Sequence, residues 1–212
     1  AALLALGLST AFAQTPTYRF SPVNQWDINK TAAYLNPIIN YVSEKSGVKL
    51  QLKIGRTSAD TTAYVLANEV EFVFSNHLFS PERDHLGWKV FGRRATPPIR
   101  SQVIVLGDSP ITKLEQLANE PVAFPGPEAT VAYKFSYANL LRQNIPIQVV
   151  FAGNMDGAFA QLASGRVKAV GTHTQLSSGW SKRENKVVRT LWESEPLNDL
   201  ALMASKKVPA KD

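Results

Sequence analysis

The sequence predicts an α/β fold made of two lobes. Strand-like and helix-like segments alternate along the chain with short connections, a pattern typical of parallel β/α layers rather than of all-α or all-β folds. Near the middle, the basic stretch 93–100 contains Pro97 and Pro98, which can continue neither a helix nor an inner strand. The chain has 212 residues, 44% of them hydrophobic and none of them cysteine, so it can bury a sizeable core without disulfides. We therefore expect two α/β lobes joined by hinge crossovers.

Hydrophobic periodicity predicts the elements of the first lobe, which we assign to residues 14–97. They are, in order, a strand at 18–21, a helix at 29–46, a strand at 48–54, a helix at 58–68 and a strand at 70–75. The first helix carries apolar residues at near-helical spacing and stops at Gly47, a residue that favours a helix end. The segment 48–54 alternates apolar and polar residues, as expected of a strand with one wetter face.

The second lobe, assigned to residues 98–196, repeats the alternation of strands and helices. Its strands are expected at 102–106, 122–124, 147–152, 167–171 and 187–192, and its longer helices at 127–144, 154–164 and 174–183. Thr112 and Glu115 have the spacing of a capping box that opens a short helix. The last segment, 197–212, contains the apolar run 200–204; we expect it to return to the first lobe and to be truncated.

The first 13 residues have the pattern of the end of a secretory signal peptide. They are apolar and uncharged, and Ala11-Phe12-Ala13 is the small-x-small pattern that a signal peptidase cuts. The segment is too short to span a membrane, and a polar stretch follows it. We therefore predict an exported protein of the periplasm whose mature chain starts near Gln14. The alternative is a hydrophobic N-terminal helix of the fold.

Charge and missing motifs limit the classes of function. Lys and Arg number 23 against 17 Asp and Glu, and the resulting net charge of +6 is dispersed, which suits an anionic ligand but argues against nucleic acid. Glycine-rich nucleotide loops, the His-Glu-x-x-His motif and the Gly-x-Ser-x-Gly elbow do not occur. The three histidines are too far apart for a zinc signature, and no cysteine supplements them. We expect neither a cofactor nor a metal.

Candidate ligand contacts lie in the turns that follow strands. In an α/β sheet these turns gather at the carboxyl ends of the strands, where helix N-termini present unpaired N–H groups to an anion. The candidates are Asn24, Gln25, Thr57, Ser58, Asn76, His77, Thr130, Asn154, His173 and Thr174. The competing interpretation is that the Ser, Thr and Asn residues cap helices and that the histidines are capping or surface residues.

Four stretches follow one another in the order and spacing of a known family. They are 19–22 with 35–37, Asp108-Ser109-Pro110-Ile111 with Leu114 and Leu117, 151–156 with 165–169, and 189–197, which contains Trp-x-Ser-x-Pro-Leu. In these stretches the chain resembles the periplasmic solute-binding proteins of the phosphate/phosphite/phosphonate ABC-transporter family, over most of the mature chain. The resemblance implies a type II periplasmic binding fold in which two lobes close on a small oxyanion without chemistry. It also implies a monomeric carrier that delivers the ligand to an ABC transporter permease at the inner membrane.

The chain departs from that family at three places. The family's Ser-Thr-Ser-Gly turn, which wraps a phosphonate, is Pro127-Glu128-Ala129-Thr130 here, and a carboxylate near a helix N-terminus disfavours a dianion at the same place. The family's His in Gly-Ser-His is Met155, and the Asp of its Val-Asp is Lys168. These departures leave the ligand open between a phosphate-, phosphite- or phosphonate-like oxyanion and a zwitterion.

Two other functions remain open from the sequence. The same fold can serve as the extracytoplasmic ligand-sensing domain of a membrane receptor, anchored by a membrane segment of its own. Residues 103–109 end in Gly-Asp-Ser, as in the SGNH hydrolases, where Ser109 would be the nucleophile of an esterase. A nucleophilic serine needs a histidine base and an acid, and no Asp-x-x-His follows to supply them. We therefore expect a binding protein rather than an enzyme.

Overall fold

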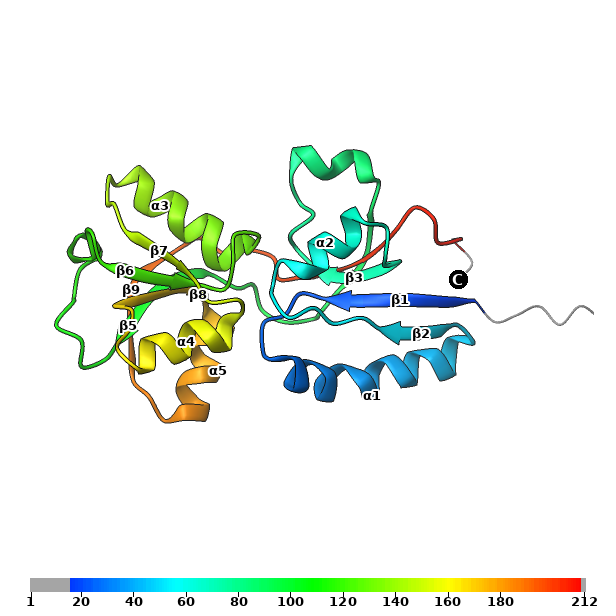
Figure 1. Ribbon diagram of the computed structural model, residues 1–212, viewed down its shortest axis with the longest axis horizontal. Helices are drawn as coiled ribbons and strands as arrows, with labels where there is room; N and C mark the ends of the chain where they lie inside the picture. The colour runs from blue at the N-terminus through cyan, green and yellow to red at the C-terminus, as the bar shows by residue number, and fades with distance from the viewer. Residues whose placement is uncertain (1–15, 211–212) are drawn as a thin grey trace, which may run out of the picture.

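The computed structural model describes residues 16–210 and shows two α/β lobes side by side, joined by two crossovers (Figure 1). Each lobe is built on a five-stranded sheet, in the order β2-β1-β3-β10-β4 for lobe 1 and β7-β6-β8-β5-β9 for lobe 2. The predicted two-lobe α/β class is confirmed. The predicted signal segment lies outside the described residues, within which no helix is both long enough and apolar enough to cross a membrane.

Lobe 1 combines the first four strands with the last one. Its elements are β1 (Thr17–Pro22), α1 (Ile28–Ser46), β2 (Lys49–Leu52), α2 (Asp60–Leu66), β3 (Phe72–Ser75), the 3-10 helix η1 (Pro81–Leu86), β4 (Lys89–Arg93) and β10 (Ala201–Ala204). The strand β1 runs parallel to β2 and β3, whereas β10 is antiparallel to both β3 and β4. Hydrophobic periodicity missed β4, whose residues are largely exposed.

Lobe 2 is formed by one continuous stretch of chain. Its elements are β5 (Ser101–Leu106), the 3-10 helix η2 (Leu114–Leu117), β6 (Pro121–Phe124), the π-helix η3 (Thr130–Phe135), α3 (Ser136–Arg142), β7 (Gln148–Phe151), α4 (Met155–Ala163), β8 (Ala169–His173), α5 (Thr174–Glu184) and β9 (Val188–Glu193). The strand β6 is parallel to β7 and β8, but β5 is antiparallel to β8 and β9. Both sheets are therefore mixed, which the prediction of parallel layers missed.

Local capping explains where several helices start and stop. The side chain of Asp27 accepts hydrogen bonds from the backbone N–H groups of Asn29 (2.9 Å) and Lys30 (3.1 Å), which fixes the start of α1. The helix ends at Gly47 in the left-handed conformation, with a φ of 73°.

Two predicted helix starts need correction. The predicted box of Thr112 and Glu115 is instead closed by Gln116, whose Oε1 accepts from the backbone N of Thr112 at 2.8 Å and of Lys113 at 2.9 Å. The helix predicted at 127–144 begins only at Thr130, and it starts in the π form before continuing as α3. Wide π turns of this kind occur often at functional sites.

The two crossovers run next to each other behind the space between the lobes. Chain segment 94–100 leads from lobe 1 to lobe 2, and segment 194–200 leads back. Ile99 and Leu197 pair across them, the N–H of Ile99 donating to Leu197 O at 2.9 Å and the N–H of Leu197 donating to Ile99 O at 2.7 Å. The two segments are thus hydrogen-bonded to each other, and such a paired connection between two lobes suits a hinge.

Candidate functional site

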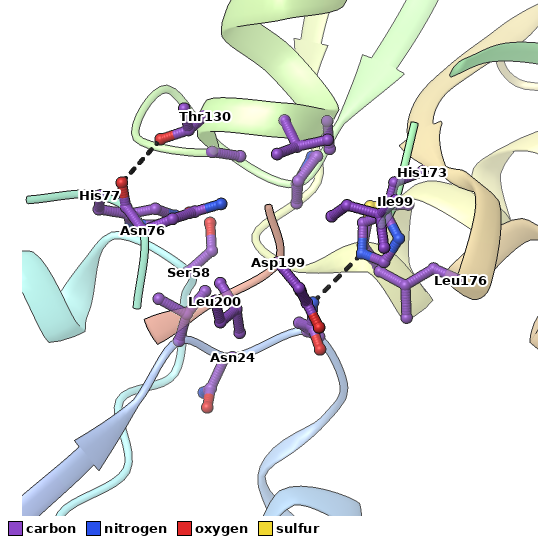
Figure 2. A pocket seen from close by; sticks show the side chains of 17 residues that line it. Asn24, Ser58, Asn76, His77, Ile99, Thr130, His173, Leu176, Asp199 and Leu200 are labelled. Carbon is purple, nitrogen blue, oxygen red and sulfur yellow. Dashed lines mark hydrogen bonds between the residues drawn. The ribbon is translucent and has the colours of Figure 1, made fainter. Parts of the chain in front are cut away.

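A small cavity lies between the lobes where the loops after four strands converge (Figure 2). Lobe 1 contributes the loops that follow β1 and β3, and lobe 2 contributes those that follow β6 and β8. Within each of these pairs the strands are parallel, so their carboxyl ends share one edge of the sheet. The cavity has a volume of about 40 Å³.

Most of the residues predicted from the sequence lie on the wall of this cavity. The seven on the wall are Asn24, Gln25, Ser58, Asn76, His77, Thr130 and His173. Figure 2 shows Ser58 and His77 on the lobe 1 side and Thr130 and His173 on the lobe 2 side, whereas the amide of Asn24 points back into lobe 1. Residues more than 100 positions apart in the sequence are thus brought together.

The other three predicted residues do not line the cavity, and their side chains form hydrogen bonds elsewhere. Thr57 Oγ1 donates to Asp60 Oδ1 at 2.8 Å in the loop before α2. Asn154 Oδ1 accepts from the N–H of Gly157 at 2.9 Å and caps α4. Thr174 Oγ1 accepts from the N–H of Arg100 at 3.2 Å at the start of α5. The capping interpretation describes Asn154, whereas Thr57 and Thr174 cap no helix.

Four buried polar atoms of the wall residues have no hydrogen-bond partner. They are Asn24 Oδ1, Ser58 Oγ, His173 Nδ1 and Asp199 Oδ1. Buried polar atoms are nearly always hydrogen-bonded, and each unsatisfied one costs free energy. Their concentration around one cavity is the arrangement expected where a polar ligand supplies the missing partners.

His173 presents a donor to the site. Its Nε2 lies 3.3 Å from Gln25 Nε2, and since an amide nitrogen can only donate, the ring nitrogen is the acceptor and the ring proton stays on Nδ1. Burial lowers the pKa of His173 to about 4, although nearby Asp199 acts in the opposite direction. The ring is therefore neutral near pH 7.

His77 is the corresponding residue of lobe 1. Its ring is buried, and its Nδ1 lies 3.4 Å from Thr62 Oγ1. Burial lowers the pKa of His77 to about 4, and the negative charge of Glu128 opposes that shift only in part. Each lobe thus contributes one neutral imidazole, and no Lys or Arg is among the described residues that line the cavity.

The start of the helix formed by η3 and α3 faces the cavity. Residues 129–132 line the wall, and the first N–H groups of a helix have no partner within it. Thr130 Oγ1 donates to the backbone oxygen of Asn76 at 3.2 Å and so joins the two lobes (Figure 2). Glu128, expected to repel a dianion here, is engaged elsewhere: Arg83 of lobe 1 donates to both of its carboxylate oxygens, at 2.8 and 3.0 Å.

Further contacts join the lobes on the other side of the cavity. Lys30 Nζ of α1 lies 2.8 Å from Asp156 Oδ2 of α4, and the backbone N–H of Met155 donates to Gln25 O at 3.1 Å. With the Arg83–Glu128 pair, these contacts hold the lobes closed over the cavity.

The most consequential residue that the sequence did not single out is Asp199. It lies in the crossover 194–200, directly before β10, and is 7% exposed. Prediction concentrated on turns between a strand and the following helix, and Asp199 is in no such turn. Its one sequence signal is an acidic residue at the edge of the apolar run 200–204. Apolar wall residues, among them Ile99, Met155 and Leu176, were not predicted either.

The geometry argues against the esterase that Ser109 could have served. Ser109 Oγ accepts from the N–H of Ile111 at 3.2 Å in the loop after β5. The strand β5 is antiparallel to β8, with Ser101 opposite His173, so Ser109 lies beyond the other end of the sheet. The remaining histidines belong to lobe 1. Ser109 therefore has no histidine base, and this alternative is withdrawn.

Comparison with protein families agrees with this geometry. The family model described as "ABC transporter, phosphonate, periplasmic substrate-binding protein" matches residues 22–212. No curated protein sequence matches the chain.

Solved structures of the same fold include two with phosphonate in their description. A binding protein component of an ABC phosphonate transporter from Pseudomonas aeruginosa has a TM-score of 0.76 at 12% identity, over 93% of this chain and 71% of that one. PhnD1 from Prochlorococcus marinus, in complex with methylphosphonate, has a TM-score of 0.76 at 14% identity, over 89% of this chain and 76% of that one. The GluR0 ligand-binding core from Nostoc punctiforme, in complex with glutamate, has a TM-score of 0.62 at 13% identity, over 92% of this chain and 87% of that one. Proteins with different ligands share the fold, so the ligand must be argued from the site.

Proposed function

Because the chain belongs to the family of periplasmic substrate-binding proteins of phosphonate ABC transporters, we propose that it captures a small oxyanion of the phosphate, phosphite or phosphonate kind between its lobes. The protein acts in the periplasm as a monomer and delivers the ligand to a permease at the inner membrane. It catalyses no reaction. The observation that carries the proposal is the set of unpartnered polar atoms on the wall of the closed cavity.

The size of the cavity supports a small ligand. A cavity of about 150 Å³ holds benzene, which has about six heavy atoms. The cavity between the lobes, about 40 Å³, is much smaller. On that scale the closed cavity has room for little more than one water molecule, so phosphite, phosphate or methylphosphonate requires the lobes to open somewhat, and a nucleotide or a long amino acid requires them to open much further.

The donors on the wall support an anionic ligand. Ser58 Oγ, His173 Nδ1 and the first N–H groups of the helix at Thr130 can all donate to oxyanion oxygens. With no Lys or Arg on the wall, an anion is stabilised by hydrogen bonds and by the helix dipole rather than by an ion pair.

An acceptor on the wall of the cavity narrows the class of ligand further. Asp199 Oδ1 lacks a partner and is an acceptor. A fully deprotonated oxyanion would place its own lone pairs against the Asp199 carboxylate, which costs free energy. We therefore infer a ligand that also carries a donor: the P–OH of a protonated oxyanion, or the ammonium of a zwitterion.

Calorimetry and thermal shift on the purified chain test the proposal. The panel contains phosphate, phosphite, methylphosphonate, aminoethylphosphonate, sulfate and small sulfonates, and the true ligand raises stability by RT ln(1 + [L]/Kd). Ser58→Ala should weaken binding about tenfold, because a hydrogen bond to a charged ligand is lost. Ser109→Ala is the matched control, since it removes a hydroxyl far from the cavity and should leave the affinity unchanged. An absence of any shift across the panel would overturn the proposal.

A sensing domain of a membrane receptor remains the second candidate, because the fold serves both roles. The coding sequence downstream of Asp212 separates them. A membrane-spanning helix followed by a kinase or cyclase domain would favour the sensor, and a nearby stop codon would favour the carrier.

A further inference from the structure

We propose that Arg94, which lies outside the cavity, is the positioning residue that turns one carboxylate oxygen of Asp199 toward the ligand and thereby selects ligands that carry a hydrogen-bond donor. This inference rests on the proposed function and names the residue behind its selectivity.

The two carboxylate oxygens of Asp199 have different surroundings. Oδ2 forms an ion pair with Nη2 of Arg94, whereas Oδ1 is buried without a partner, on a residue that lines the cavity. The backbone oxygen of Asp199 is held as well, because Arg93 Nη1 donates to it at 2.7 Å. Since one oxygen is engaged and the backbone is held, the carboxylate has one favoured orientation.

Arg94 itself is fixed from several directions. Its guanidinium lies over the ring of Phe74 in β3, 5.3 Å from the ring centroid, which is a cation–π contact. It does not line the cavity between the lobes but borders a separate apolar groove of lobe 1. Arg94 therefore acts on a ligand only through Asp199.

The ion pair of Arg94 and Asp199 joins the two crossovers, so the proposed ligand selectivity depends on residues of the hinge. Arg94 opens the crossover 94–100, and Asp199 ends the crossover 194–200 just before β10. Arg93, next to Arg94, and Ala201, two residues after Asp199, pair in the antiparallel register of β4 and β10. A carboxylate buried without its cation would be strongly unfavourable, so loss of Arg94 should make Asp199 reorient, bind water or take up a proton.

The test compares matched donor-bearing and donor-free oxyanions by calorimetry at slightly acid pH: phosphate with sulfate, and methylphosphonate with methanesulfonate. The wild-type chain should prefer the donor-bearing member of each pair by about tenfold or more, since mispairing a buried acceptor is costly. Arg94→Met should remove most of that preference. Arg94→Lys, which keeps a cation in place, should retain part of it.

A double-mutant cycle separates positioning from a general structural role. In an Asp199→Asn background, Arg94→Met should have no further effect on the preference, because the group that it positions is already altered. Arg142→Met is the matched control: the guanidinium of Arg142 donates to Asn139 Oδ1 on α3 at 3.1 Å, away from Asp199, so the preference should persist.

The outcomes are distinguishable. Equal loss of affinity for both members of a pair, or additive effects of Arg94→Met and Asp199→Asn, would overturn the positioning role while leaving the proposed function intact. If the wild-type chain binds no oxyanion, both the proposed function and the positioning role of Arg94 are overturned. Should Arg94→Met not fold, as judged by its thermal midpoint, Arg94→Lys and Arg94→Gln carry the same comparison.

Discussion

The two lobes share an architecture but differ in how completely their sheets are covered. In lobe 2, α3 packs on one face and α4 and α5 on the other, and the two core clusters contain eleven and ten buried residues. The corresponding clusters of lobe 1 contain six and three. On the α1 side of its sheet, Phe72, Phe91 and Leu202 border an apolar groove of about 310 Å³. Since burial of apolar surface drives folding, lobe 2 should be the more stable body and lobe 1 the more adaptable one.

The largest expected effect tests that difference in the cores. Phe124 in β6 is fully buried against Tyr133, so Phe124→Ala should lower the free energy of unfolding by about 3–5 kcal/mol. Phe91 in β4 is 59% exposed at the groove, and Phe91→Ala should cost at most about 1 kcal/mol. Urea unfolding followed by circular dichroism measures both. Losses of similar size would mean that the lobes are equally well packed.

The two lobes should respond alike to acid, because each contains one buried histidine. Burial lowers the pKa values of His77 and His173 to about 4, from 6.5, so between these values the unfolded chain binds more protons. Stability is then full above pH 6.5 and is lost as the pH falls toward 4, by roughly 3 kcal/mol for each histidine.

Thermal midpoints between pH 7 and 4 check this linkage in the wild-type chain, His77→Gln and His173→Gln. Each variant should have a shallower dependence on pH, and the two reductions should be similar. A slope that both substitutions leave unchanged would assign the acid sensitivity to other groups.

At the boundary between the lobes, the shielded Arg83–Glu128 pair should matter for closure. Hydrogen bonding from Arg83 holds the pKa of Glu128 below its ordinary value, against the opposing effect of burial. Glu128→Gln should weaken ligand binding about tenfold, because the pair joins the lobes only when they are closed. Ligand dissociation rates measured by stopped flow should rise accordingly. An unchanged rate would show that the pair contributes nothing to closure.

The smallest effect is expected at the other ion pair between the lobes. Lys30 is half exposed where it meets Asp156, and exposed pairs contribute less than about 1 kcal/mol. Lys30→Met should therefore change the dissociation rate severalfold at most, and the difference from wild type should vanish in high salt. A larger effect than that of Glu128→Gln would reverse the ranking of the two pairs.

Prediction from the sequence succeeded where one physical signal dominates. The apolar runs that became β5 and β8 are buried on both faces, so their composition alone indicates strands. The strand β4 was missed because its exposed, basic residues lack that signal. Strand direction was also missed, since periodicity reports which face is buried and not which way the chain runs.

The same limit applies to the site. The predicted strand ends identified seven residues of the cavity wall, because the carboxyl ends of parallel strands lie at the same edge of a sheet. Thr57, Asn154 and Thr174 could not be separated from ligand contacts, because the hydroxyl and amide groups that bind anions also cap helices, as Asn154 does, or bond other parts of the chain, as Thr57 and Thr174 do. Asp199 depends on a contact with Arg94, 105 residues away, which no local pattern reveals.

The place of β10 in lobe 1 determines the order in which the protein can be assembled. This strand lies between β3 and β4, yet it is the last of the described strands in the chain, and Ala204 pairs with Phe72 from the first half of the chain. Lobe 2 can fold from its own contiguous segment, whereas the sheet of lobe 1 lacks a strand between β3 and β4 until the chain has returned. Such distant pairings slow folding because a long loop must close first. The binding cleft is therefore complete only when the chain has returned to lobe 1 through β10.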